Sequence, residues 1–383
     1  MEIDEIICQC YNFGLKQKEI VSVLSCQFGY TISIRHLRRI LSRLNLCRRN
    51  RTDIIIVANF IADNLKFSGQ QHGYRLMHLK CSLSGLSIGM HDVRNLLKIL
   101  DPEGVDLRRR KRLVRRRYYS KGPNFMWHID SYDKLKPYGI AINGCIDGFS
   151  RYILWLEANY TASDPRVVGA YFVSAVENLG GCPEYMRGDR GTENVVVAQL
   201  QTFFHETFNP ANTTEHFRYG RSTANQRIEN WWCFLRRQCT EFWISFFQML
   251  KRDGLFNGNL LELEIMRFVF MEIIQNDLDE IKMLWNLHPI RRTNNDQLAY
   301  GRPVMMFTSP EEYGVYDYIR PVPCHYLQEC KEECTFKDNV FCDVDVNEMC
   351  ILLMQEHGWQ KANDAISGRE LYERLRRRLQ TVV

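Results

Sequence analysis

The chain has 383 residues, 45% of them hydrophobic and 25% charged, a composition typical of a globular protein with two or three domains. No apolar run reaches the roughly 18 residues that a transmembrane helix needs, and the acidic start argues against a secretory signal peptide, so we expect no membrane segment. The net charge of +5 is unevenly placed: residues 1–122 hold 23 Lys and Arg against 10 Asp and Glu, whereas residues 123–383 hold 27 against 35. This asymmetry favours a nucleic-acid-binding arm over a merely solvated basic surface.

Residues 1–50 are predicted to form a helix-turn-helix-like unit. Apolar residues recur at helical spacing up to a break at Gly29, and Ser33 is the expected N-cap of the next helix. A basic face on that second helix suits a DNA major groove, although small helical hairpins with one basic face also serve packing or oligomerisation. The candidate DNA-binding residues of this unit are Arg35, Arg38 and Arg39.

Residues 51–106 predict a second unit of the same kind. The apolar residues within 52–68, beginning with the run at residues 54–57, are typical of a buried helix. Residues 69–100 then contain Gly-Tyr-Arg, a helix, a Gly-x-Ser turn and another helix, and a strong breaker follows at Asp101–Gly104. This order resembles the helix-turn-helix that precedes the catalytic core in bacterial insertion-sequence transposases of the integrase type.

Residues 107–122 form a predicted basic linker. Phosphate contact is the expected use of so many cations, because each neutralised phosphate releases counterions. The alternative is a solvated linker, and a nuclear-import signal is compatible with either. The candidate DNA-binding residues of the linker are Arg108, Arg109, Arg110, Lys111, Arg112, Arg115, Arg116 and Arg117.

From residue 124 the hydrophobic pattern changes to short strands. Three apolar runs predict an antiparallel meander, followed by a helix, a strand leading to Asp189, a second helix, a fifth strand and a long helix carrying Glu229. This order of elements is that of the ribonuclease-H-like fold. The predicted fold class is therefore α/β, with a ribonuclease-H-like core (a mixed five-stranded sheet with helices) at residues 123–290. Small all-α helix-turn-helix units precede this core, and a mostly helical C-terminal region, residues 291–383, follows it.

Three acidic residues, Asp130, Asp189 and Glu229, fall where this fold can bring them together. The first and fourth strands lie side by side, so we expect Asp130 and Asp189 at neighbouring strand ends, with Glu229 reaching the same point from a helix. A few carboxylates suit Mg²⁺, and two ions about 4 Å apart can activate an attacking oxygen and stabilise the leaving one. Each acid could individually be a cap or a surface group. Asp147 and Glu193 are instead expected to support turns.

Several motifs share the order and spacing of an integrase core. They are Trp127–Asp130, Ile146–Arg151, Gly181–Pro183, Asp189–Asn194 and Asn225–Glu229. On these residues the chain resembles eukaryotic integrase-core proteins of the retroviral and retrotransposon integrase and D,D-E transposase superfamily. The resemblance implies that Asp130, Asp189 and Glu229 are the catalytic and metal-binding residues, holding two Mg²⁺ (or Mn²⁺) ions. It also implies DNA contacts near the catalytic helix from Arg221, Asn225, Gln226 and Arg227.

The flanking regions depart from the retroviral pattern. The N-terminal region lacks the paired His and paired Cys of a zinc site, and Arg190 stands where many members have Asn. The cysteines near the C-terminus fit no standard zinc spacing, and we interpret the 14 dispersed cysteines as reduced thiols that mostly fill cores. Residues 367–383 suggest a basic helix, which is a partner helix, a nuclear signal or a solvated end.

These patterns predict a nuclear DNA integrase or transposase-like polynucleotidyl transferase, acting on double-stranded DNA by Mg²⁺-dependent 3′-end processing and strand transfer. Joining two DNA ends implies a homo-oligomer. The first alternative is a domesticated integrase-derived DNA-binding or scaffold protein without catalysis. A ribonuclease-H-type nuclease is a third hypothesis, which the helix-turn-helix units and the spacing of the acids disfavour.

Overall fold

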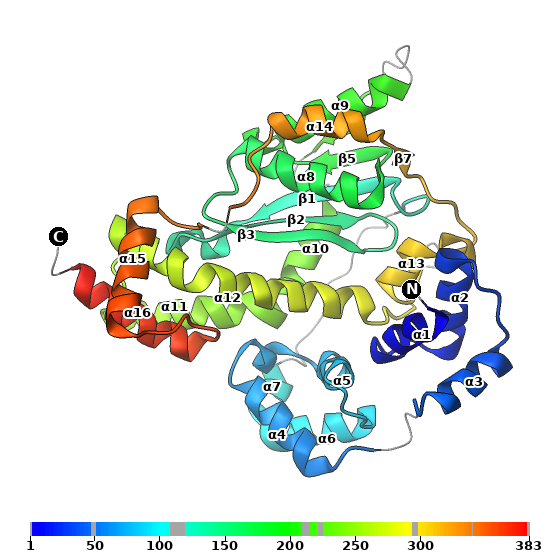
Figure 1. The fold of residues 1–383 in the computed structure, drawn as a ribbon, viewed down its shortest axis with the longest axis horizontal. Helices are drawn as coiled ribbons and strands as arrows, with labels where there is room; N and C mark the ends of the chain where they lie inside the picture. Colours follow the sequence, from blue (N-terminus) through cyan, green and yellow to red (C-terminus); the bar gives the residue numbers. More distant parts are fainter. Residues whose placement is uncertain are drawn as a thin grey trace. The chain divides into compact units, whose positions relative to one another are not determined.

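The computed structural model describes the chain as two compact units (Figure 1). The first unit comprises Met1–Pro123, Phe149–Tyr152 and Met283–Asp317, and the second comprises Asn124–Gly148, Ile153–Lys282 and Tyr318–Val383. The described residues are 2–46, 51–107, 119–208, 214–220, 225–292, 298–338 and 340–380. Within these ranges no helix has both the length and the apolar character needed to cross a membrane.

The first unit begins with α1 (Ile3–Asn12), α2 (Gln17–Phe28) and α3 (Ile34–Arg43). Gly29 ends α2 with a φ of 69°, and the Ser33 side chain accepts a hydrogen bond from the His36 N–H, as expected of an N-cap. The helix α3 buries an apolar face that includes Leu37. The predicted helical pair and its cap are therefore confirmed.

The next helices of this unit are α4 (Ile54–Leu65), α5 (Tyr74–Leu83), α6 (Met90–Leu100) and α7 (Pro102–Leu107). They share a small apolar core formed by Val57, Ile61, Met77, Cys81, Val93 and Leu97. The interpretation of residues 54–57 as wholly buried is wrong, because Ile54, Ile55 and Ile56 are 54%, 66% and 55% exposed. Only Val57 of this run points into the core, since a helix buries one face at a time.

Residues that follow the predicted core complete the first unit. The short helix α13 (Pro303–Thr308) packs against α2. Arg302, buried at its start, donates to the Glu19 carboxylate of α2 at 3.0 Å and to the Gly14 carbonyl at 2.8 Å. A buried guanidinium needs such partners, so these bonds fasten the later segment to the N-terminal helices.

The second unit is built on a five-stranded sheet with the order β3-β2-β1-β5-β6. The strands are β1 (Met126–Tyr132), β2 (Ala141–Asp147), β3 (Ile153–Asn159), β5 (Tyr185–Gly188) and β6 (Phe217–Tyr219). Strands β1, β2 and β3 pair in antiparallel fashion, whereas β5 runs parallel to both β1 and β6. The predicted mixed sheet and ribonuclease-H-like fold are confirmed, with β1 at the centre. A separate pair joins β4 (Gly181–Cys182) to β7 (Arg320–Pro321).

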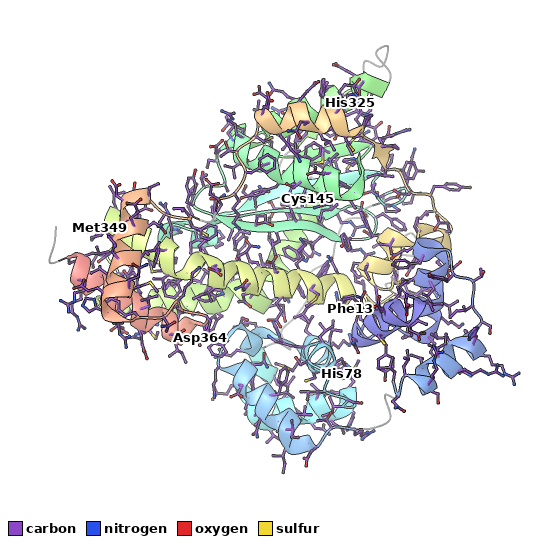
Figure 2. The ribbon with its side chains drawn as sticks, viewed as in Figure 1. Phe13, His78, Cys145, His325, Met349 and Asp364 are labelled. Atoms are coloured by element: carbon purple, nitrogen blue, oxygen red, sulfur yellow. The ribbon has the colours of Figure 1, made fainter. Side chains whose placement is uncertain are left out.

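The two faces of this sheet carry different helices (Figure 1). The helices α8 (Pro165–Leu179), α9 (Val195–Phe208) and α14 (Cys324–Glu332) enclose the main core, in which Trp127 packs edge-on against Phe172. Successive strand residues point to opposite faces, so Trp127 and Ile129 face this core while His128 and Asp130 face α10 (Gln226–Leu235). Figure 2 shows the side chains, with fully buried Cys145 marking β2.

A helical extension follows the sheet. The helix α10 passes through a π-helical turn, Arg236–Thr240, into α11 (Glu241–Arg252), and α12 (Leu260–Leu287), α15 (Val344–His357) and α16 (Ala365–Leu379) follow. The predicted basic C-terminal helix is α16, and its leucines at 371, 375 and 379 are buried. Arg376 donates to the fully buried Glu262 carboxylate at 2.8 Å. The helix is therefore packed within the second unit, and it is not a solvated end.

Two stacked histidines join α9 to β6. The buried rings of His205 and His216 lie 3.6 Å apart at 7°, and His205 Nε2–H donates to the Pro183 carbonyl at 2.9 Å. Burial lowers the pKa of His205, and the neighbouring His216 lowers it further. As the pH falls below about 6.5, the unfolded chain therefore binds a proton at His205 before the folded protein does. The stability that neutral His205 contributes is present above that pH and is lost below it.

We predict that His205→Gln reduces the acid sensitivity of the fold. Glutamine keeps an N–H donor for the Pro183 carbonyl but cannot become charged. The free energy of unfolding, measured with urea, should fall between pH 7 and pH 5.5 by about 1 kcal/mol less in the variant than in the wild type. An equal fall in the two proteins would remove His205 from the acid response.

Candidate active site

Asp130 and Asp189 leave neighbouring strands at the same level of the sheet. Strands β1 and β5 pair in register, with His128 opposite Arg187 as their last pair. Asp130 follows His128 by two residues and Asp189 follows Arg187 by two, so the paired strands carry the two acids side by side. The structure extends β1 to Tyr132, so Asp130 lies within this strand, whereas it was predicted at the strand end. Both carboxyl side chains are partly buried.

The turn after β5 fixes the orientation of Asp189. Its Oδ1 accepts a hydrogen bond from the Gly191 N–H at 3.1 Å and another from Asn194 Nδ2 at 3.0 Å. Asn194 belongs to the 3₁₀ turn Thr192–Asn194 and also donates to Glu193 Oε1 at 3.4 Å. The predicted role of Glu193 in supporting this loop agrees with that contact. The loop thus holds Asp189 through one of its two oxygens.

Glu229 reaches the same region from the first turn of α10, which packs against β1 and β2. It is partly exposed and does not point into the apolar core. Burial raises its pKa, and the negative charge of Asp189 raises it further. The three predicted catalytic acids therefore lie on two adjacent strands and on the helix that crosses them.

The charges of the three acids act on one another. The pKa of Asp130 is raised to about 7, first by burial and then by the nearby charges of Glu229 and Asp189, while a bond from Trp232 opposes the rise. Other acids are placed differently: Asp133 forms an exposed pair with Lys136, and fully buried Asp147 accepts a bond from the Asn124 N–H at 2.8 Å. Glu193 does lie near the site, and its pKa is raised by burial and then by the charge of Asp189. Asp130, Asp189 and Glu229 thus share one electrostatic environment, in which each carboxylate disfavours the charge of its neighbours.

The indole of Trp232 positions Asp130. Its Nε1–H donates to Asp130 Oδ2 at 2.8 Å, and its ring packs on Tyr132. Beneath the ring lies Gly144, the β2 residue opposite Asp130, where an added Cβ would come within 2.8 Å of the indole. The sequence contains a signal for this position, because Trp232 follows Glu229 by three residues and so shares its helix face.

A buried polar link joins β1 to the start of α10. His128 Nδ1 bonds to Asn225 Oδ1 at 2.6 Å, and Asn225 Nδ2 donates to the Ile129 carbonyl at 2.8 Å. Burial lowers the pKa of His128 to about 3, so the ring is neutral at physiological pH. Both functional groups of the Asn225 amide are thus engaged by β1. The position of Asn225 supports a bracing role, and its predicted contact with DNA has no support from this geometry.

The other predicted DNA contacts are distributed between the two units. Arg35, Arg38 and Arg39 are exposed on α3, and Arg38 donates to Gln17 at 3.0 Å. Gln226 and Arg227 are partly buried on α10. The predicted contacts in the basic linker, residues 108–117, and Arg221 lie outside the described residues.

A cationic hollow of about 720 Å³ adjoins the turn that carries Asp189. Arg187 and Arg190 flank Asp189 in the sequence, and Arg218 enters from β6, where its guanidinium lies 3.9 Å from the centre of the Tyr185 ring. Sequence reasoning did not select these three arginines, although two of them flank a predicted catalytic acid. Three guanidinium groups beside the acidic site can bind phosphate oxygens.

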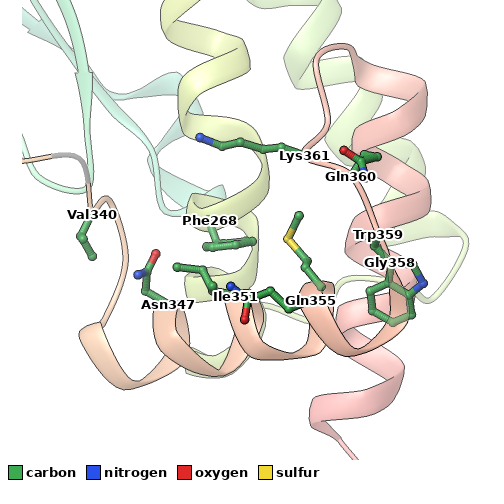
Figure 3. Close-up of a pocket in the computed structure, with 10 residues that line it drawn as sticks. Phe268, Val340, Asn347, Ile351, Gln355, Gly358, Trp359, Gln360 and Lys361 are labelled. Carbon is green, nitrogen blue, oxygen red and sulfur yellow. The ribbon is translucent and has the colours of Figure 1, made fainter.

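A second hollow, of about 650 Å³, lies among α12, α15 and the segment that follows α15 (Figure 3). Its walls include Phe268, Ile351 and Trp359, and the only charged side chain that lines it is Lys361. None of its lining residues is an acid, a histidine or a cysteine. The one titratable side chain in its lining, Lys361, is paired with Glu272. The lining offers no carboxylate, imidazole or thiol to a metal ion, and we place the candidate active site at the carboxylates.

The acidic site contains the type of ligand that a divalent cation requires, but the ligands are not gathered around one point. Among the described residues no three His, Cys, Asp or Glu side chains are gathered closely enough to hold a metal ion. The donor types nevertheless fit Mg²⁺, which prefers carboxylate oxygens together with water and phosphate. A cation would also relieve the mutual repulsion that raises the pKa values of Asp130 and Glu229. Binding it requires the three side chains to close on the ion.

The chain is similar to a known protein family. A protein-family model described as an integrase core domain matches residues 117–308, half of the chain. The match includes the sheet, the three carboxylates and α10. No curated protein matches the chain.

We predict that Trp232→Phe weakens the site while keeping the fold. Phenylalanine preserves an aromatic ring over Gly144 but removes the hydrogen bond to Asp130. One such bond to a charged group contributes about 1.5–3 kcal/mol, so metal-dependent activity on DNA should fall roughly 10- to 100-fold. The matched control is Trp231→Phe, because the Trp231 ring is equally buried in α10 and the bond to Asp130 comes from Trp232. Equal losses in the two variants would mean that packing alone is affected.

Proposed function

The chain belongs to the integrase core domain family, and we propose that it is a Mg²⁺-dependent polynucleotidyl transferase that trims DNA 3′ ends and joins them to target DNA. The observation that carries this proposal is the shared environment of Asp130, Asp189 and Glu229. Burial and the charges of Glu229 and Asp189 raise the pKa of Asp130, and burial and the charge of Asp189 raise that of Glu229. Such a cluster is unfavourable without a counter-charge, and divalent cations supply one.

The proposed roles follow from the position of each carboxylate. Asp130 and Asp189, on adjacent strands, and Glu229, on α10, would together hold the divalent cations. Bound cations supply Lewis-acid activation of the attacking oxygen and charge stabilisation of the leaving oxygen. Trp232 and Asn194 orient the carboxylates of Asp130 and Asp189.

The reaction is a direct displacement at phosphorus. In end trimming the nucleophile is water, and in joining it is the 3′-hydroxyl of the trimmed DNA end. One P–O bond forms as the bond to the leaving 3′ oxygen breaks, and the proton of the nucleophile passes to solvent. No covalent bond to the protein is required, because positioning and charge stabilisation account for the catalysis.

Double-stranded DNA is the proposed partner. Arg187, Arg190 and Arg218 supply positive charge beside Asp189, where the backbone of a bound strand passes. The exposed arginines of α3 add a second cationic surface in the first unit. Joining two DNA ends calls for a homo-oligomer, and the basic segment at residues 107–122 supports a nuclear location as part of the same proposal.

The alternative is an integrase-derived DNA-binding or scaffold protein that does not catalyse strand transfer. It uses the same cationic surfaces and makes no demand on the carboxylates. The two functions therefore differ in one respect, which is the response to removing a single carboxylate charge while DNA binding stays intact.

We predict that purified protein joins oligonucleotide duplexes to a plasmid in the presence of Mg²⁺ or Mn²⁺. Asp189→Asn should lower strand transfer roughly 100-fold or more, since several kcal/mol of transition-state stabilisation depend on the cations. Asp133→Asn, an exposed acid paired with Lys136, is the matched control and should retain activity. Duplex binding should survive in both variants.

Strand transfer that is unchanged by Asp189→Asn would refute the proposed active site. Duplex binding without any joining, in wild type and variants alike, would favour the scaffold alternative.

A further inference from the structure

The helix α6 presents a polar stripe that the fold leaves uncovered. His91, Arg94, Asn95 and Lys98 are all exposed, and their spacing of three and four residues puts them on one face of the helix. The opposite face is apolar, with Val93 fully buried and Leu97 1% exposed in the core of the first unit. The orientation of α6 is therefore fixed by burial, and the stripe must face outward.

The chain before α6 holds this orientation. Gly85, with a φ of +77°, follows the end of α5 and reverses the direction of the chain. The Leu86 N–H then donates to the Cys81 carbonyl at 2.9 Å. The Thr52 N–H donates to the Ser87 carbonyl at 2.8 Å, and the Ser87 N–H donates to the Thr52 hydroxyl at 2.9 Å. These contacts form a helix, a glycine turn and a second helix, the arrangement in which the second helix can enter a DNA major groove.

The side chains of the stripe are ordered by their neighbours. Asn95 Nδ2 lies 3.1 Å from His91 Nδ1, and because an amide nitrogen only donates, the imidazole accepts. Asn95 keeps Oδ1 and its second N–H for another partner, which is the acceptor and donor pair that matches N6 and N7 of adenine. Arg94 lies over the Tyr74 ring of α5, with its guanidinium 5.7 Å from the ring centre.

The charge on this surface is complementary to a DNA backbone. Arg75 lies over the same Tyr74 ring at 5.2 Å, beside Arg94, and Lys98 follows one turn along α6. The acid within α6 is Asp92, which is paired with Arg51 at 3.2 Å, and Asp101 at the end of the helix accepts a bond from the Gly104 N–H. Cations therefore dominate the outward face of α6.

We propose that α6 is a base-reading helix for duplex DNA, in which Asn95 recognises adenine and Arg94 recognises guanine. Lys98 and Arg75 contact phosphates. On α3, two of the exposed arginines, Arg38 and Arg43, are already bonded to Gln17 and Asp4 within the unit. This inference takes duplex DNA as the substrate class from the proposed function, but it assigns sequence selection to a site distinct from the carboxylates.

The test is duplex binding by the full chain in EDTA, where no cation-dependent chemistry occurs. A randomised duplex pool is selected on the wild type, and anisotropy then compares the enriched duplex with a scrambled one. Asn95→Ala should reduce the preference for the enriched duplex roughly 10- to 100-fold and leave binding to the scrambled duplex unchanged. Asn59→Ala, which changes an exposed asparagine on α4, is the matched control and should keep the preference.

A second pair of variants separates phosphate contact from base reading. Lys98→Ala should weaken binding to both duplexes alike and reduce the slope of log affinity against log salt by about 1. Lys66→Ala, a lysine on the same unit that pairs with Asp63, should change neither.

The proposal is overturned if the pool yields no enriched sequence, or if Asn95→Ala and Arg94→Ala keep the full preference. Because binding is measured without divalent cations, a protein that selects its sequence but joins no DNA would refute the proposed catalysis and leave the role of α6 standing.

Discussion

Burial and mutual repulsion of carboxylates set the electrostatics of the candidate site in the second unit. Asp130, Asp189 and Glu229 come from two parallel strands and one helix, and Asp130 and Glu229 lose water while they gain negative neighbours. Burial alone raises the pKa of a carboxyl group, and like charges raise it further. A bound divalent cation would reverse both effects, which is the physical basis of the proposed metal site.

The surrounding residues fix the positions of these carboxylates. Trp232 bonds to Asp130, and the absence of a side chain at Gly144 lets the indole approach the sheet closely. Asn225 ties the first turn of α10 to β1, which fixes the helix that carries Glu229. Polar groups buried in this way are satisfied only in one arrangement, so they give the site a defined geometry.

Much of this could be predicted from the sequence, because the signals are local. The Ser33 cap, the alternation of strands and the order of elements around Asp189 each depend on residues close together in the chain. The bond from Trp232 to Asp130 spans 102 residues and depends on strand register, which no local pattern encodes. The contact of Arg302 with Glu19 spans 283 residues and likewise could not be predicted from a local sequence pattern. Ile55 was expected to be buried but is exposed, because an apolar run does not reveal which helix face is buried.

We propose that the three carboxylates close around divalent cations. The most direct measurement is an anomalous-difference map from crystals soaked in Mn²⁺, recorded for the wild type and for Asp189→Asn. We expect manganese bound by oxygens of Asp130, Asp189 and Glu229 in the wild type, and loss of that signal in the variant. Manganese absent from this site, or bound equally well in Asp189→Asn, would contradict it.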